Sequence, residues 1–323
     1  MITYLLLLLG FVLLFKGADY FIDGAGELAE HFGVSHLFIG LTIAAIGTSA
    51  PEAAVSIKAS IIGANEIALG NIIGSNIANI ALAIGITALF KPLCIEGSTI
   101  KFELPFSIII TIILLFFAID FLPLHSLAQL SRIEGIIFIL LLFLFIIYLL
   151  RMAKTDREKN ILFNKELRHN SLFKAIFLVI IGGFAIVIGG NLVVKNAIKI
   201  AVLWGVSKKL IAISVVAFGT SIPEIVTSIT AGLKGKTSIA VGNIIGSNIY
   251  NIVFVLGIAS IINPILVQHK ISNDIIICLG FSLLFFLYTL KKKKIIRLHG
   301  IIFIILYIIY IFYLIITDNP IVM

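Results

Sequence analysis

The hydrophobic residues of this chain occur in long runs, which are interrupted by short stretches that contain charge, Pro or Gly. A helix needs about 20 mainly apolar residues to cross a bilayer, and ten windows of roughly that length follow one another. They lie near residues 2–22, 36–60, 66–89, 104–122, 134–151, 173–195, 210–233, 238–262, 273–290 and 298–316. The pattern predicts an all-α membrane protein with ten transmembrane helices.

Composition supports this prediction, because 60% of the residues are hydrophobic, 12% are charged and the mean hydropathy is +1.19. Soluble domains contain about 25% charged residues. The first apolar run lacks the basic start and the cleavage site of a signal peptide, so we expect it to be retained as a helix. Cys94 and Cys278 are far apart at or within apolar runs, so neither a disulfide nor a metal framework is expected.

Four of the ten windows are less hydrophobic than the others. The windows 36–60, 66–89, 210–233 and 238–262 are rich in Gly, Ser, Thr, Asn and Ala. Exposed backbone and hydroxyl groups are unfavourable in lipid, where no water satisfies them. We therefore expect these four helices in the interior of the bundle.

The net charge of +8 is better explained by membrane topology than by binding to nucleic acid, because the basic residues sit at the ends of apolar runs. The most basic connections are 151–174 and 291–297. If both are cytoplasmic, both termini are external and the protein lies in the cell membrane. One group of lysines would then be external, against the trend: Lys195, Lys199, Lys208 and Lys209.

The chain also contains an internal repeat, because residues 44–60 recur as 216–232 and residues 70–80 recur as 242–252, at a constant offset of 172. Each copy holds about five windows, and an odd number of spans places the second copy upside down relative to the first. Inverted repeats are typical of secondary transporters, whose sites lie at the repeat interface near the midplane.

This repeat predicts the domain organisation. The first five-helix repeat is residues 1–151, with its core at 36–89, and a cytoplasmic linker follows at 152–172. The second, inverted repeat is residues 173–323, with its core at 210–262.

Two acidic residues, Glu52 and Glu224, fall inside predicted spans at equivalent places in the two copies. An ionisable group at membrane depth costs about 2.5 kcal/mol or more on insertion scales and marks a functional site. Pro51 and Pro223 directly precede them, and a helical proline removes the hydrogen bond to the carbonyl four residues back. The resulting kinks should also loosen neighbouring carbonyls, namely those of Ala45, Thr48, Ala217 and Thr220.

Hydroxyl and amide side chains complete the repeated set. They are Thr48, Ser49, Ser75 and Asn79 in the first copy and Thr220, Ser221, Ser247 and Asn251 in the second. Neither 44–80 nor 216–252 contains His or Cys, so zinc and copper fit poorly. A set made only of oxygen ligands favours hard cations such as calcium, and two carboxylates neutralise one divalent ion.

The motifs GTSAPE with GNIIGSNIAN, and GTSIPE with GNIIGSNIYN, resemble the paired alpha-repeat signatures of sodium/calcium exchangers in the cation/calcium antiporter superfamily. The resemblance implies a ten-span exchanger of the prokaryotic type that functions as a monomer in the bilayer, with no cofactor beside the transported calcium and sodium. It also implies that the first helix of each half slides across the other eight.

The resemblance further implies how the oxygen ligands are divided between the ions. Glu52, Glu224 and the carbonyls of Thr48 and Thr220 would bind calcium, and Asn79 and Asn251 would line the middle of the site. Sodium would use Ser49, Ser75, Ser221 and Ser247 with the carbonyls of Ala45 and Ala217. Potassium-dependent relatives and some prokaryotic members carry Asp where this chain has Asn251, which favours potassium independence and removes one titratable group.

Three other functions remain open from the residues alone. A calcium/proton antiporter of the same superfamily is the nearest, although such relatives usually carry an acidic residue in the second motif. A cation channel fits the residue types but suits inverted, kinked helix pairs less well. A membrane-embedded hydrolase would need a nucleophile with a base, or a metal motif, and the sequence contains neither in a recognisable form. The acidic positions Asp19, Asp23 and Glu27 predict a solvated helix end instead of an ion path.

Overall fold

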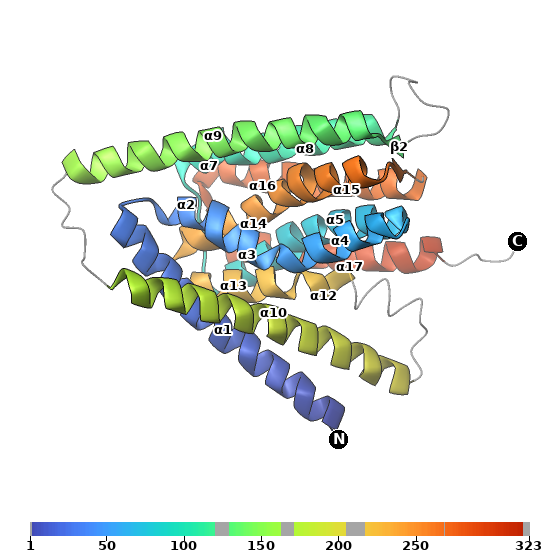
Figure 1. Ribbon diagram of the computed structural model, residues 1–323, viewed down its shortest axis with the longest axis horizontal. Coiled ribbons are helices and arrows are strands. Elements are labelled where there is room, and N and C mark those ends of the chain that lie inside the picture. The colour runs from blue at the N-terminus through green and yellow to red at the C-terminus, as the bar shows by residue number, and fades with distance from the viewer. Residues whose placement is uncertain (1, 120–128, 163–170, 205–216, 268, 319–323) are drawn as a thin grey trace, which may run out of the picture.

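A computed structural model describes residues 2–119, 129–162, 171–204, 217–267 and 269–318. Within these ranges the protein is almost entirely helical, and the long helices run roughly along its longest axis (Figure 1). Among the described residues, eight helices are long and apolar enough to span a membrane, and a bent pair adds a ninth. The shorter apolar helix Ile222–Leu233 lies within the predicted seventh span, 210–233, and residues 210–216 of that span lie outside the described ranges.

The first half of the chain forms helices that correspond to the first five windows, together with two short strands. In order its elements are α1 (Ile2–Phe32), α2 (His36–Ile39), the π-helical η1 (Gly40–Ala44), α3 (Ala45–Thr48), α4 (Ala50–Ile61), α5 (Asn65–Ala78), the π-helical η2 (Asn79–Ile84), α6 (Gly85–Phe90), β1 (Leu93–Cys94), α7 (Gly97–Lys101), α8 (Glu103–Ala118), β2 (Gln129–Leu130) and α9 (Arg132–Leu162).

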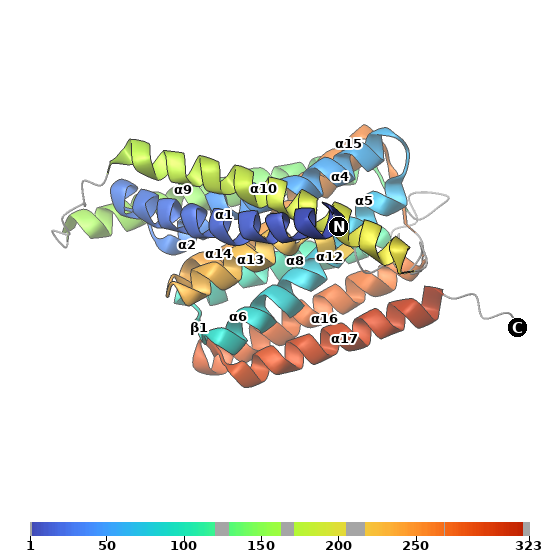
Figure 2. The ribbon, with the colours of Figure 1, turned by 90° about the horizontal axis from the view of Figure 1, so that it is seen from below.

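The elements of the second half are α10 (Leu172–Leu203), α12 (Ala217–Thr220), α13 (Ile222–Leu233), α14 (Thr237–Tyr250), the π-helical η4 (Asn251–Leu256), α15 (Gly257–Ile262), β3 (Ile265–Leu266), α16 (His269–Lys292), β4 (Lys294–Ile295) and α17 (Arg297–Asp318). From α12 onward, the described elements follow the order of the first half from α3, except that one helix, α16, takes the place of α7 and α8. Helix α1 begins and α17 ends toward the same end of the molecule (Figure 1, Figure 2), as an even number of spans requires.

Two predicted boundaries differ from the structure for identifiable reasons. The first window stops at residue 22, yet α1 continues to Phe32, because Ala25, Leu28 and Ala29 are buried and the acidic residues of this part pair with lysines. Lys234 Nζ lies 3.3 Å from Asp19 Oδ1 and 2.9 Å from Asp23 Oδ1, and Lys174 Nζ lies 3.3 Å from Glu27 Oε1.

The other difference concerns the expected linker at 152–172. Residues 152–162 continue α9 as a helix, and Lys154 and Glu158 form an i,i+4 ion pair on its surface. Residues 163–170 of the expected linker lie outside the described ranges.

The repeated, less hydrophobic segments at 66–89 and 238–262 lie inside the molecule, as predicted, and most of the described residues Ile222–Leu233 are also buried. The segment 36–60 is only partly buried, because Ile46 and Val55 are 54% and 37% exposed. In the spans Ile67–Phe90 and Thr237–Ile262, 83% of the most apolar window is buried, against 22–39% in the other long spans. The remaining long helices therefore present their apolar side chains to lipid, which is the arrangement that a chain with this composition needs in a bilayer.

Helices α1 and α10 pack along each other as an antiparallel pair, which crosses the other helices obliquely (Figure 1, Figure 2). Glycines bring the two backbones together, because a Cβ atom on Gly182 would lie 2.7 Å from the Gly17 carbonyl oxygen and one on Gly189 would lie 2.8 Å from that of Gly10. Gly10 and Gly182 are equivalent in the repeat, as are Gly17 and Gly189. The contact therefore obeys the same pseudo-two-fold relationship as the motifs.

Two short antiparallel strand pairs tie the halves together. β1 pairs with β4 through Leu93 and Ile295, and β2 pairs with β3 through Leu130 and Ile265. Each strand pair joins a segment between two helices of the first half to such a segment of the second half. The two halves are therefore held together by these strands as well as by helix packing.

Candidate cation site

The structure breaks the second helix of each repeat directly before the glutamate. Ser49 separates α3 from α4 with φ −81° and ψ 3°, and the two parts meet at a bend of 48°. Ser221 separates α12 from α13 with φ −84° and ψ −1°. Pro51 and Pro223 follow in the first turn of the new helix, where their missing N–H costs nothing. The sequence therefore starts a helix at each break and places a carboxylate in its first turn.

Glu52 and Glu224 are both fully buried, each with 0% of its surface exposed. Ser75 Oγ donates to Glu52 Oε1 at 3.3 Å, and Ser49 Oγ donates to Glu224 Oε1 at 3.0 Å. Glu52 Oε2 and Glu224 Oε2 have no hydrogen-bond partner within the described part of the chain. Each glutamate thus keeps one carboxylate oxygen available for a ligand.

Two threonines connect the halves across the site. Thr48 Oγ1 donates to Asn243 Oδ1 at 3.0 Å and lies 3.5 Å from Ser247 Oγ. In the equivalent position, Thr220 Oγ1 donates to Asn71 Oδ1 at 3.2 Å. Its oxygen also lies 3.2 Å from Ser75 Oγ. The predicted hydroxyl positions are therefore brought together in one buried cluster.

Asn71 and Asn243 were not among the predicted site residues. Their amide nitrogens donate to Ser56 Oγ and Ser228 Oγ, each at 3.0 Å, so their oxygens are left to accept from the threonines. The sequence held a signal for them, because both repeat within the Gly-Asn of the second motif. Like the serines, each amide occupies the same place in both copies, and both are buried.

Asn79 and Asn251 lie at the start of η2 and η4, where the α-helical pattern widens to a π-helical turn. Such turns occur often at functional sites. Asn79 Nδ2 donates to Asn248 Oδ1 at 3.0 Å, and Asn251 Nδ2 donates to Asn76 Oδ1 at 2.9 Å. The side-chain oxygens of Asn79 and Asn251 have no partner among the described residues.

The predicted carbonyl ligands near the helix breaks differ in whether a hydrogen-bond donor reaches them. The Ala45 carbonyl accepts from Ser49 N–H at 3.1 Å and from Ser247 Oγ at 3.4 Å, so the kink does not leave it free in this structure. Ala217 begins α12 at the edge of the described residues. Pro51 has no N–H, so it cannot make the usual helical hydrogen bond to the Gly47 carbonyl.

Five oxygens of the site are buried and have no donor among the residues described: Glu52 Oε2, Glu224 Oε2, Asn79 Oδ1, Asn251 Oδ1 and Ser221 Oγ. Buried acceptors without a donor are costly in a protein interior. Carboxylate, amide and hydroxyl oxygens are the ligands that hard cations prefer. In the described ranges no three His, Cys, Asp or Glu side chains gather, so the two glutamates supply the charge at this place.

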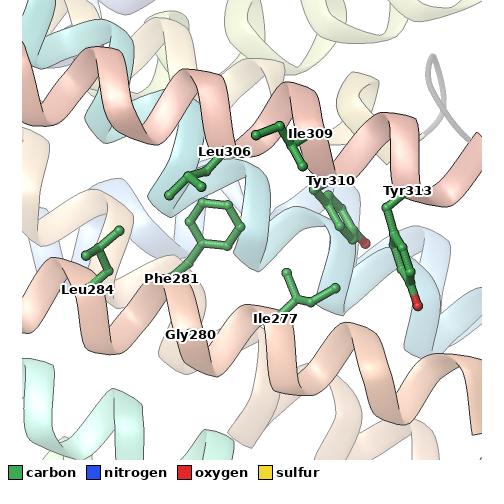
Figure 3. Close-up of a pocket in the computed structure, with 8 residues that line it drawn as sticks. All are labelled: Ile277, Gly280, Phe281, Leu284, Leu306, Ile309, Tyr310 and Tyr313. Carbon is green, nitrogen blue, oxygen red and sulfur yellow. The ribbon is translucent and has the colours of Figure 1, made fainter.

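Among the cavities of the described structure, one with apolar walls adjoins the site and another lies away from it. One, of about 520 Å³, reaches Ser49 between α2–α4 and α9. The other, of about 330 Å³, lies between α16 and α17 (Figure 3), where the rings of Phe281, Tyr310 and Tyr313 form part of its wall. Its lining contains none of the site residues and no charged side chain, so it does not suit a metal ion.

Comparison with known proteins identifies the family. The family model described as sodium/calcium exchanger protein matches residues 2–151 and 174–316. The chain belongs to the sodium/calcium exchanger family. It is therefore a multi-pass membrane antiporter of the cation/calcium exchanger type and not an enzyme, as the sequence predicted.

Relatives of this exchanger match it over nearly its whole length. The sodium/calcium exchanger MaX1 of Methanosarcina acetivorans is 33% identical, with 95% of this chain and 97% of MaX1 covered. The inner membrane protein YrbG of Escherichia coli is 33% identical, with 89% of each chain covered.

A solved structure of the sodium-calcium exchanger NCX_Mj superposes with a TM-score of 0.82 at 34% identity, covering 96% of this chain and 99% of that one. Crystals of NCX_Mj were soaked with sodium and calcium. This match confirms the predicted fold class, a helical membrane protein with the ten-helix inverted-repeat fold.

Proposed function

We propose that this protein exchanges sodium for calcium across the cell membrane by alternating access at the buried site between its halves. The observation that carries the proposal is the meeting of Glu52 and Glu224, one from each half, in a cluster of oxygen atoms. Each carboxylate keeps one oxygen without a hydrogen-bond partner among the described residues. The sodium and calcium soaks of NCX_Mj support the choice of ions.

Electrostatics explains why such a site would exchange ions instead of conducting them. Two unneutralised carboxylates in a low-dielectric interior carry a penalty of several kcal/mol each. The carrier would therefore change its orientation readily with cations bound and reluctantly when empty. Calcium neutralises both charges at once, and sodium ions compete for the same oxygens, so the two fluxes are coupled.

We assign the oxygen ligands to calcium and to sodium as the family resemblance implies. Calcium would lie between Glu52 and Glu224 with the carbonyls of Thr48 and Thr220, while the oxygens of Asn79 and Asn251 face the middle. The sodium ions would use the hydroxyls of the four serines and the flanking carbonyls: Ser49, Ser75, Ser221, Ser247, Ala45 and Ala217. Because the Ala45 carbonyl accepts from Ser247 Oγ, sodium bound to both oxygens would replace this hydrogen bond.

The pair α1–α10 is the element that we expect to move. Its helices bind each other through backbone contacts at Gly10, Gly17, Gly182 and Gly189, so they would slide as one body. α10 also contacts the site directly, because a Cβ atom on Gly190 would lie 3.3 Å from Pro223 Cγ. Sliding would therefore change the surroundings of the α12–α13 break.

The experiment uses purified protein in proteoliposomes loaded with sodium and diluted into sodium-free medium that contains calcium-45. We expect calcium uptake that requires internal sodium and needs no potassium, since Asn251 replaces the aspartate of potassium-dependent relatives. Uptake of equal size with internal choline would contradict exchange and indicate a channel. Uptake driven by a pH gradient without sodium would instead support the calcium/proton antiporter.

A further inference from the structure

Four buried asparagines form a closed hydrogen-bonded group at the centre of the molecule: Asn76 and Asn79 from the first half, and Asn248 and Asn251 from the second. Asn76 Nδ2 donates to the backbone carbonyl of Asn248 at 3.2 Å, and Asn248 Nδ2 donates to the backbone carbonyl of Asn76 at 3.2 Å. Each of these two residues also contacts the side chain of one inner asparagine, Asn251 or Asn79.

This arrangement fixes which end of each amide points where. A backbone carbonyl can only accept a hydrogen bond, so the end of Asn76 that faces it must be the NH₂ group, which donates. The other end of Asn76 is then its oxygen, and it faces Asn251 at 2.9 Å. An oxygen needs a donor, so Asn251 must turn its own NH₂ group toward Asn76.

The consequence appears at the cation site. Because the NH₂ group of Asn251 is committed to Asn76, the Oδ1 atom of Asn251 is the end that remains, and it is buried without a partner among the described residues. The same reasoning runs from Asn248 to Asn79, at 3.0 Å. Each half of the protein thus orients an amide that belongs to the other half.

We propose that Asn76 and Asn248 are positioning residues, which set the polarity of Asn251 and Asn79 so that these show oxygen, and not NH₂, to the bound cation. The inference rests on the proposed function, since it concerns the ligands of that same site. An NH₂ group aimed at a cation would repel it. Without Asn76, the amide of Asn251 is free to turn around.

The test measures equilibrium binding of calcium-45 to purified protein in detergent, which requires no counter-ion and no transport. Loss of a partner that orients a metal ligand typically costs about 10–100-fold in affinity. We therefore expect Asn76→Ala and Asn248→Ala each to weaken calcium binding by about that factor. Size-exclusion chromatography checks that the variants remain folded.

A second substitution separates positioning from general loss of structure. A carboxylate has an oxygen at both ends, so Asn251→Asp makes the orientation at residue 251 irrelevant. Asn251→Asp should recover at least about 10-fold of the affinity lost in Asn76→Ala, but little of that lost in Asn248→Ala. Conversely, Asn79→Asp should rescue Asn248→Ala and not Asn76→Ala.

This crossed pattern decides the inference. Equal rescue of both alanine variants by Asn251→Asp would reflect added charge alone and would overturn it, as would the absence of any rescue. If an alanine variant does not fold, Asn76→Asp is compared with Asn76→Leu, since both lose the donor to the Asn248 carbonyl and only Asp keeps an acceptor that faces Asn251. Asn76→Asp should then bind calcium at least about 10-fold more tightly than Asn76→Leu, and equal binding would contradict the proposal. Wild-type protein that binds no calcium would overturn the proposed function as well, whereas wild-type binding without the crossed pattern would overturn this inference alone.

Discussion

Ser49 Oγ, in the first half, donates a 3.0 Å hydrogen bond to Glu224 Oε1 in the second half. Its equivalent, Ser221, is fully buried and its Oγ has no partner in the described part of the molecule. The site therefore departs from two-fold symmetry at this pair, although Thr48 and Thr220 make matching bonds. A fully symmetric inverted repeat would be equally open to both sides, so a carrier that faces one side must break symmetry somewhere.

The carboxylates should be indispensable. Glu52→Gln and Glu224→Gln should each reduce sodium-driven calcium uptake by about 100-fold or more, because each removes a charged ligand that the two-charge site needs to neutralise calcium. Proteoliposome uptake of calcium-45 measures this. Glu158→Gln is the matched control, since Glu158 lies on the surface of α9 and pairs only weakly with Lys154. Wild-type uptake by either site variant would show that the cation binds elsewhere.

The asymmetry between Ser49 and Ser221 predicts that replacing each by alanine changes the stability of the ion-free protein in opposite directions. Ser221→Ala removes a buried hydroxyl that has no partner among the residues described and should raise the unfolding temperature without ions. Ser49→Ala removes the donor to Glu224 and should destabilise the ion-free protein by roughly 1–3 kcal/mol.

Thermal unfolding in detergent, with and without sodium, measures both effects. Because both serines are proposed sodium ligands, each variant should also gain less stability from sodium than wild type does. Shifts of the same sign for both variants without ions would contradict the asymmetry.

The contact between α1 and α10 predicts different tolerance at two adjacent glycines. A Cβ atom on Gly182 would lie 2.5 Å from Phe21 N and 2.7 Å from the Gly17 carbonyl oxygen, whereas one on Gly183 would lie 3.7 Å from the Phe21 ring. Gly182→Ala should therefore destabilise the protein by about 1–3 kcal/mol, and Gly183→Ala should be nearly neutral. Chromatographic thermostability assays would compare the pair, and equal stability would show that the two helices are not packed this closely.

The turn between α13 and α14 holds the C-terminal half of α1. Lys234 Nζ donates to the Asp19 carbonyl and Lys236 Nζ donates to the Ile22 carbonyl, each at 2.9 Å. Lys234→Gln removes the ion pairs with Asp19 and Asp23, and partly exposed pairs contribute about 0.2–1 kcal/mol.

Hydrogen exchange in residues 19–32 should accordingly become up to about fivefold faster in Lys234→Gln. Lys154→Gln, which breaks only an exposed pair on α9, should leave exchange in α1 unchanged. Unaltered exchange in Lys234→Gln would mean that apolar packing alone holds this part of α1.

Much of this protein follows from its sequence. The third window was predicted at 66–89, and the structure forms α5, η2 and α6 over residues 65–90. Long apolar runs determine such helices because the bilayer requires every backbone group to be bonded within the segment. The offset of 172 between the two motifs likewise determined the inverted repeat, and the paired motifs determined the family.

Only the tertiary structure decided which side chains meet. Thr48 donates a hydrogen bond to Asn243 of the other half, and Asn76 accepts one from Asn251. The two copies carry the same residues at most of these places. The sequence therefore could not say whether such bonds form within a copy or between copies. Nor could it show that Ser49 has a partner while Ser221 has none among the described residues. Identical motifs specify identical local helices, whereas contacts between residues more than a hundred positions apart depend on how those helices pack, and it is packing that brings oxygens of both halves around one buried site.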